Sequence, residues 1–179
     1  MTVSISTQYL RDVNQSIVYF LSNETYIRSG ASSYVTNTLK GFFPGLDITL
    51  GYVDQLDKLK LPAIALVPPV TVSGGEDMAF GNHVKVENFS YQLFGFMGKQ
   101  QTHGDNLVER DKLVEDLKAL LEDQDYITLM QFDGSDTVDS GGNISIENVS
   151  FTFFPPEEEP EASRYRFSLD FDVEYLKEI

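Results

Sequence analysis

The chain has 179 residues, of which 41% are hydrophobic, so it can form one domain with a substantial core. It has no cysteine, which excludes disulfides and sulfur-ligated metals. Its net charge of −15 opposes binding to nucleic acid phosphates and anionic lipids. No apolar run approaches the ~18 residues needed to span a bilayer, and the first residues lack the pattern of a signal peptide. We therefore expect neither membrane insertion nor sequence-specific nucleic acid binding.

The negative charge is distributed unevenly along the chain. Residues 1–46 contain three basic and two acidic residues, a net charge of +1, whereas the remainder contains 10 basic and 26 acidic residues. The N-terminal quarter should therefore be the easier part to bury against another chain.

The N-terminal half is predicted to begin with helices and continue as strands. Apolar residues at helical spacing predict a helix over 7–22, and a shorter one is expected over Ser33–Leu39, ended by Gly41 before a turn at Pro44-Gly45. Alternation predicts a strand over 47–53, and the apolar run 63–67, ended by two prolines, predicts a buried strand. The glycine-containing stretch 73–83 is expected to be an exposed loop.

A long strand over 84–97 should follow. Its apolar residues change face at Phe94, which indicates either a bulge or an end buried on both sides. A leucine-rich amphipathic pattern predicts a helix over 104–123, and a short strand over 127–132 should precede an acidic loop over 133–142. Residues 144–154 read as a strand in which a one-residue bulge near Glu147-Asn148 would bring two apolar sets to the core face.

The C-terminal region has the clearest pattern in the chain. From 165 to 175 apolar and polar residues alternate without interruption, which predicts a strand with one buried and one wet face. It should pair with 144–154 in a long antiparallel hairpin whose acidic tip is 155–163. We therefore predict a single α+β domain over 1–179, with a mostly antiparallel sheet on which an N-terminal helix and a second long helix pack.

Motifs for catalysis or metal binding are weak. The loop 133–142 has alternating oxygen ligands like a calcium loop, but Val138 replaces the turn glycine and Ile144 replaces the final glutamate. Glutamates of the proline-flanked tip could attract cations, although an exposed tip is the simpler interpretation. His83 and His103 lack a third nitrogen or sulfur ligand, and no nucleophile elbow or phosphate-binding loop occurs. We expect no enzyme activity, metal or cofactor.

The order of parts is that of a known family. An amphipathic helix leads to P-A-I-A-L at 62–66 and to a strand ending in Q-L-F-G-F at 92–96; the helix N-L-V-E-R-D-K-L-V-E-D-L-K-A-L-L and the strand Y-R-F-S-L-D-F-D-V-E-Y follow. This layout, from about residue 7 to 176, resembles the tail terminator (tail-completion) proteins of long-tailed bacteriophages.

The resemblance implies a structural virion protein that forms a homohexameric ring. Such a ring caps the tail tube at its head-proximal end, contacts the tube protein and the neck connector, and in contractile tails also meets the sheath. It would be assembled in the host cytoplasm, and DNA would slide through it without sticking. Candidate assembly contacts are Gly74, Gly75, Glu76, Met78, Phe80, Asp133, Asp136, Asp139, Glu157, Glu158 and Glu159.

Two other classes fit the composition. An acidic binding module, such as a DNA-mimicking or immunity-type inhibitor, explains the charge and the missing catalytic motifs, but not the long hairpin. A cation-dependent hydrolase would use Asp133, Asp136 and Asp139. Particle mass in solution separates rings from small monomers.

Overall fold

The computed structural model describes residues 10–29, 34–51, 62–69, 76–77, 84–97, 103–124, 126–133, 136–153 and 165–178. These ranges contain three helices and nine strands. The helices are α1 (Leu10–Asn23), α2 (Leu39–Phe42) and α3 (His103–Glu122). The strands are β1 (Thr25–Ser29), β2 (Tyr34–Thr38), β3 (Asp47–Leu50), β4 (Ala63–Val67), β5 (Glu76–Asp77), β6 (Val84–Met97), β7 (Ile127–Asp133), β8 (Asp136–Phe153) and β9 (Tyr165–Glu178).

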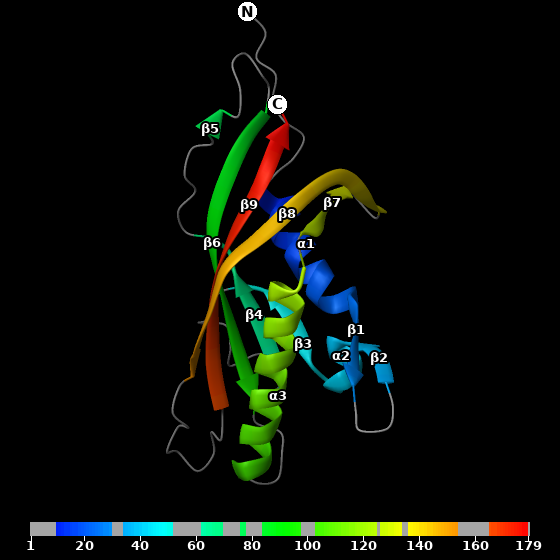
Figure 1. Ribbon diagram of the computed structural model, residues 1–179, viewed down its shortest axis with the longest axis vertical. Coiled ribbons are helices and arrows are strands. Elements are labelled where there is room, and N and C mark those ends of the chain that lie inside the picture. Colours follow the sequence, from blue (N-terminus) through cyan, green and yellow to red (C-terminus); the bar gives the residue numbers. More distant parts are fainter. Residues whose placement is uncertain are drawn as a thin grey trace, which may run out of the picture.

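Seven strands form one sheet in the order β3-β4-β6-β9-β8-β7, with β5 paired to β6. All neighbours are antiparallel except β3 and β4. The long strands β6, β8 and β9 run the length of the molecule, and β1 and β2 form a separate two-stranded sheet beside α2 (Figure 1). The predicted α+β architecture, with its antiparallel C-terminal hairpin, is therefore confirmed.

The alternating residues of β9 set the inner face of the sheet. Phe167, Leu169, Phe171, Val173 and Tyr175 are all buried, as their spacing predicts. They lie opposite the inward residues of β6 in a register that does not shift along either strand. This inner face is the sheet's contribution to the core.

Both long helices cover this face. α3 contacts β6, β8 and β9, whereas α1 contacts β7 and β3. Leucines of α3 and the apolar stripe of α1 join the sheet residues in one hydrophobic cluster. At about 25 cal/mol per Å² of apolar surface removed from water, such burial is the main force that holds the layers together.

The bulge predicted in β8 is present. The β8–β9 register shifts by one residue between Glu147 and Ser150, and Asn148 has a positive φ of 53°. Asparagine tolerates this left-handed conformation better than most residues. The shift brings Ile146 and Phe151 to the same face, where both pack against the core.

The apolar residues of β6 change face because the end of the strand is buried on both sides, which is one of the two predicted explanations. β6 has no bulge against β4 or β9, and its end is buried on both sides. Phe96 on the outer side is only 3% exposed. Ser168, expected on the wet face of β9, lies at this end and is 4% exposed, which corrects that expectation.

Three predicted elements differ from the structure. The first is the loop expected over 73–83, in which Glu76–Asp77 form strand β5 against β6. The helix expected over Ser33–Leu39 is strand β2, which pairs with β1; its β-branched residues favour a strand, and the pairing supplies the backbone hydrogen bonds. The following helix α2 starts at Leu39, where the Thr38 Oγ1 accepts a hydrogen bond from the Gly41 N–H at 3.2 Å. Gly41 thus lies inside α2 and does not end the preceding segment.

The loop expected over 133–142 is largely strand. Asp136 pairs with Asp133, and β8 continues along β7 without leaving the sheet. The register shifts by two residues between Leu129 and Met130, so that Ser140 and Gly141 of β8 have no partner in the β7 register. Acidic and glycine residues disfavour strands by propensity, but the partner strand satisfies their backbone groups.

Candidate assembly surfaces

The structure places four of the predicted contact residues, on two separate elements. Glu76 lies in β5, paired to one end of β6, while Asp133, Asp136 and Asp139 lie in the β7–β8 hairpin. β5 and this hairpin stand on opposite sides of the molecule in Figure 1, so the structure does not bring them together. Gly74, Gly75, Met78, Phe80, Glu157, Glu158 and Glu159 lie outside the described residues.

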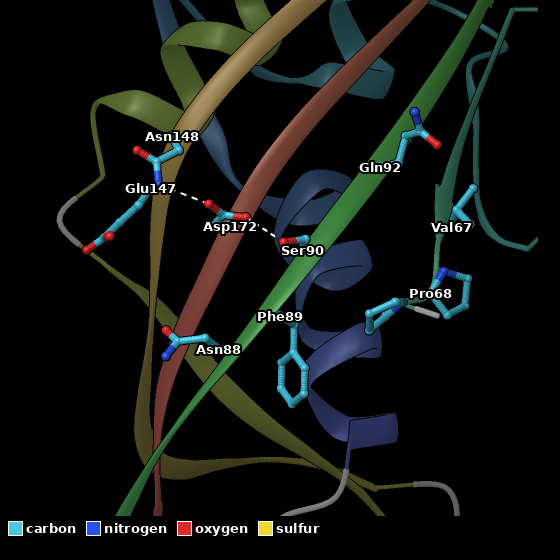
Figure 2. Close-up of a pocket in the computed structure, with 10 residues that line it drawn as sticks. Val67, Pro68, Asn88, Phe89, Ser90, Gln92, Glu147, Asn148 and Asp172 are labelled. Carbon is cyan, nitrogen blue, oxygen red and sulfur yellow. Dashed lines mark hydrogen bonds between the residues drawn. The ribbon is translucent and has the colours of Figure 1, made fainter. Parts of the chain in front are cut away.

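The outer face of the sheet is a polar surface built from three neighbouring strands. In the register, Asp172 of β9 lies between Ser90 of β6 and Glu147 of β8, and Asp170 lies opposite Gln92. Asp172 accepts hydrogen bonds from the Ser90 Oγ at 2.7 Å and the Asn148 Nδ2 at 2.9 Å (Figure 2). The bulge is what turns Asn148 toward this carboxylate.

A hollow of about 650 Å³ opens on this face between the β4 end at Val67 and the bulge at Asn148. Among the described residues, its lining includes the carboxylates of Glu147 and Asp172 but no lysine, arginine or histidine. It can donate hydrogen bonds and attract cations, and it repels phosphates. Among the described residues no group of three His, Cys, Asp or Glu side chains is arranged to hold a metal ion.

The β1–β2 hairpin carries the most exposed apolar side chains of the described chain. Tyr34 is 80% exposed and Ile27 63%, and the two are diagonal neighbours on one face because Ile27 lies opposite Thr36. No acidic residue occurs in either strand. This outer face of the hairpin had no signal in the sequence, because no strand was expected at 25–29.

The other face of the hairpin is anchored to the body. Arg28 and Tyr26 both donate hydrogen bonds to the Asp116 carboxylate of α3. The Arg28 guanidinium also lies over the rings of Phe42 and Phe43, 4.4 and 5.0 Å from their centroids. Burial and the hydrogen bond to Asp116 raise the pKa of Tyr26 well above its usual value, so the phenol stays protonated as the donor.

A second surface without a described carboxylate lies beside α1. A groove of about 680 Å³ runs between the exposed side of α1 and the end of β3. Tyr19 and Leu50 are about 40% exposed in its wall, at 41% and 39%. Among the described residues of the lining, Arg11 is the one that carries a charge, and it donates a hydrogen bond to Asp12 at 3.0 Å. The groove lining is Arg11, Gln15, Val18, Tyr19, Ser22, Asn23 and Leu50.

The open edge of β7 is covered by α1. The Ser16 hydroxyl accepts a hydrogen bond from the Met130 N–H at 2.8 Å and lies 3.3 Å from its carbonyl oxygen. Satisfying both backbone groups at the register shift blunts this edge against pairing with another chain. This part of the β7 edge is therefore protected against pairing with a further strand.

No protein-family model matches the chain, and no curated protein sequence matches it significantly. None of the helices in the described ranges is long and apolar enough to cross a membrane.

Proposed function

We propose that this protein is a structural subunit of a phage tail terminator ring. The observation that carries the proposal is the separation of surfaces: exposed apolar side chains gather on the β1–β2 hairpin, whose strands contain no acidic residue, whereas the outer sheet face is acidic. A subunit with different surfaces on different sides is suited to head-to-tail assembly, which closes into rings. The resemblance of the order of helices and strands to tail terminator proteins is the reason for proposing a tail terminator ring.

The proposed ring is a homohexamer that stops growth of the tail tube. It contacts the tube protein on one side and the neck connector on the other, and it meets the sheath in a contractile tail. Six copies at −15 each carry a charge of about −90. An acidic channel lining would let DNA pass without the phosphate contacts that Lys and Arg make. The protein would work in the virion neck without enzymatic turnover.

Mixing the protein with purified tail tubes tests this proposal. We expect six-fold rings by negative-stain microscopy, free or at one end of each tube, and an arrest of tube lengthening. Light scattering that gives the 20.2 kDa monomer at high concentration, with bare tube ends, would contradict it.

The acidic binding module is retained as a second candidate because of the outer sheet face. Glu147, Asp170 and Asp172 lie on neighbouring strands there, and a row of carboxylates can imitate DNA phosphates. This candidate predicts a monomer that ignores tubes and competes with DNA for a basic partner.

A further inference from the structure

Among the residues that the structure describes, two exposed surfaces contain no carboxylate. In β1 and β2 the one charged side chain is Arg28, which is paired with Asp116. The described lining of the α1 groove has one charged side chain, that of Arg11, which donates a hydrogen bond to the Asp12 carboxylate. For a chain of net charge −15, these are the surfaces on which two copies can meet without burying opposed carboxylates.

The two surfaces also differ in form, since one projects and the other is hollow. Ile27 and Tyr34 project side by side from one face of a two-stranded ribbon. The α1 groove is hollow and has an apolar wall that includes Val18, Tyr19 and Leu50. Tyrosine is enriched in the cores of protein interfaces, where charged residues are depleted. A single pair of strands is only marginally stable in water, so a partner surface would also stabilise the hairpin.

We infer that the β1–β2 hairpin of one subunit docks, through Ile27 and Tyr34, into the α1 groove of a second copy of this chain. The hairpin and the α1 groove are different surfaces of one molecule, so the contact is head-to-tail. The same contact can therefore repeat between successive copies around a ring. The inference rests on the proposed ring and specifies its subunit contact. It also explains why the near-neutral N-terminal quarter is kept free of the acidity of the remaining chain.

Crosslinking tests the contact directly, because the natural chain has no cysteine. Tyr34→Cys and Tyr19→Cys variants are mixed and treated with a short thiol-to-thiol crosslinker. Neither single variant can join hairpin to groove by itself, so a heterodimer band reports the intermolecular contact. A chain with both changes should give a ladder that ends at the hexamer. Val108→Cys, at an exposed apolar site of α3, replaces Tyr34→Cys in the control and should give no band above background.

A second measurement uses the affinity between copies. Tyr34→Asp with Ile27→Asp should weaken association at least about 30-fold, as expected for the loss of an interface hot spot. The control Val108→Asp should change it less than about two-fold. Both variants should keep the circular dichroism spectrum of the parent, since all three side chains are exposed.

The outcomes separate the inference from the proposed function. Rings that form without a crosslink between positions 19 and 34 would overturn the inference and leave the ring intact. Crosslinks of Tyr34→Cys only to itself, or only to the tube protein, would overturn it likewise. Failure to form any assembly, alone or on tubes, would overturn the proposed function together with the contact.

Discussion

At the scale of single residues, close approach explains why Gly95 interrupts the apolar run of β6. Gly95 lies opposite Phe167 of β9, and the Phe167 side chain is fully buried. A Cβ at position 95 would lie 2.1 Å from carbon atoms of the Phe167 ring. The glycine in Q-L-F-G-F is therefore a packing requirement, since the ring occupies the space over its backbone.

Gly95→Ala should accordingly destabilise the protein by about 1–3 kcal/mol through overpacking. Urea unfolding measures the change. Gly51→Ala is the matched control, because a Cβ there meets no atom within 4 Å. If the two variants unfold at the same urea concentration, Phe167 does not occupy this position in solution.

A buried tyrosine joins α1 to the sheet. The Tyr91 hydroxyl donates a hydrogen bond to the Asn14 Oδ1 at 2.5 Å, and both residues are less than 10% exposed. Tyr91→Phe should cost about 1–3 kcal/mol, because it leaves the buried amide oxygen without its donor. Tyr34→Phe, on an exposed site, should leave the free energy of unfolding unchanged. Comparable losses in both variants would show that the buried hydrogen bond contributes nothing.

The same tyrosine should make the free energy of unfolding decrease at alkaline pH. Burial raises the pKa of Tyr91 above its usual value, so the folded state favours the neutral phenol. A raised folded pKa gives a stabilising contribution that is complete below the unfolded pKa of about 10 and declines as pH rises above it. Urea midpoints should therefore fall above pH ~10 and fall less in Tyr91→Phe. An equal decline in the two proteins would contradict this origin.

At the scale of secondary-structure elements, the β8 bulge has two roles that can be separated. It keeps apolar residues on both sides of the bulge facing the core, and it directs Asn148 to Asp172. Asn148→Val should cost about 1–2 kcal/mol from the left-handed backbone alone, in addition to the lost hydrogen bond. Asn148→Gly keeps the backbone and loses only the hydrogen bond. Thermal unfolding should rank Val below Gly, and the reverse order would mean that the bulge is absent.

At the scale of the whole molecule, net charge bears on the association that we propose. Copies of net charge −15 repel one another, while the described side chains of the inferred contact include no carboxylate. Salt screens this repulsion, since the Debye length falls from about 30 Å at 0.01 M to about 3 Å at 1 M. We therefore expect the particle mass measured by light scattering to increase with salt. A mass that decreases with salt would point to ion pairs between subunits.

Local patterns in the sequence were sufficient for most of this fold. Strand β4, strand β6, the bulge at Glu147-Asn148 and the buried face of β9 all follow from periodicity within a few residues. Each is determined by the alternation of its own side chains and by burial of one face. No partner needs to be known to predict such elements.

The tertiary structure was needed for every feature that depends on contact with a distant segment of the same chain. Strand β2 forms because β1 satisfies its backbone hydrogen bonds. The first half of β8 forms for the same reason against β7, although its acidic and glycine residues disfavour a strand. The anchor between Arg28 and Asp116 joins residues 88 positions apart, and the α1 groove exists only because β3 ends beside α1. Such contacts arise from packing between distant segments, and local spacing carries no record of them. The candidate assembly surfaces therefore became visible only once the chain was folded.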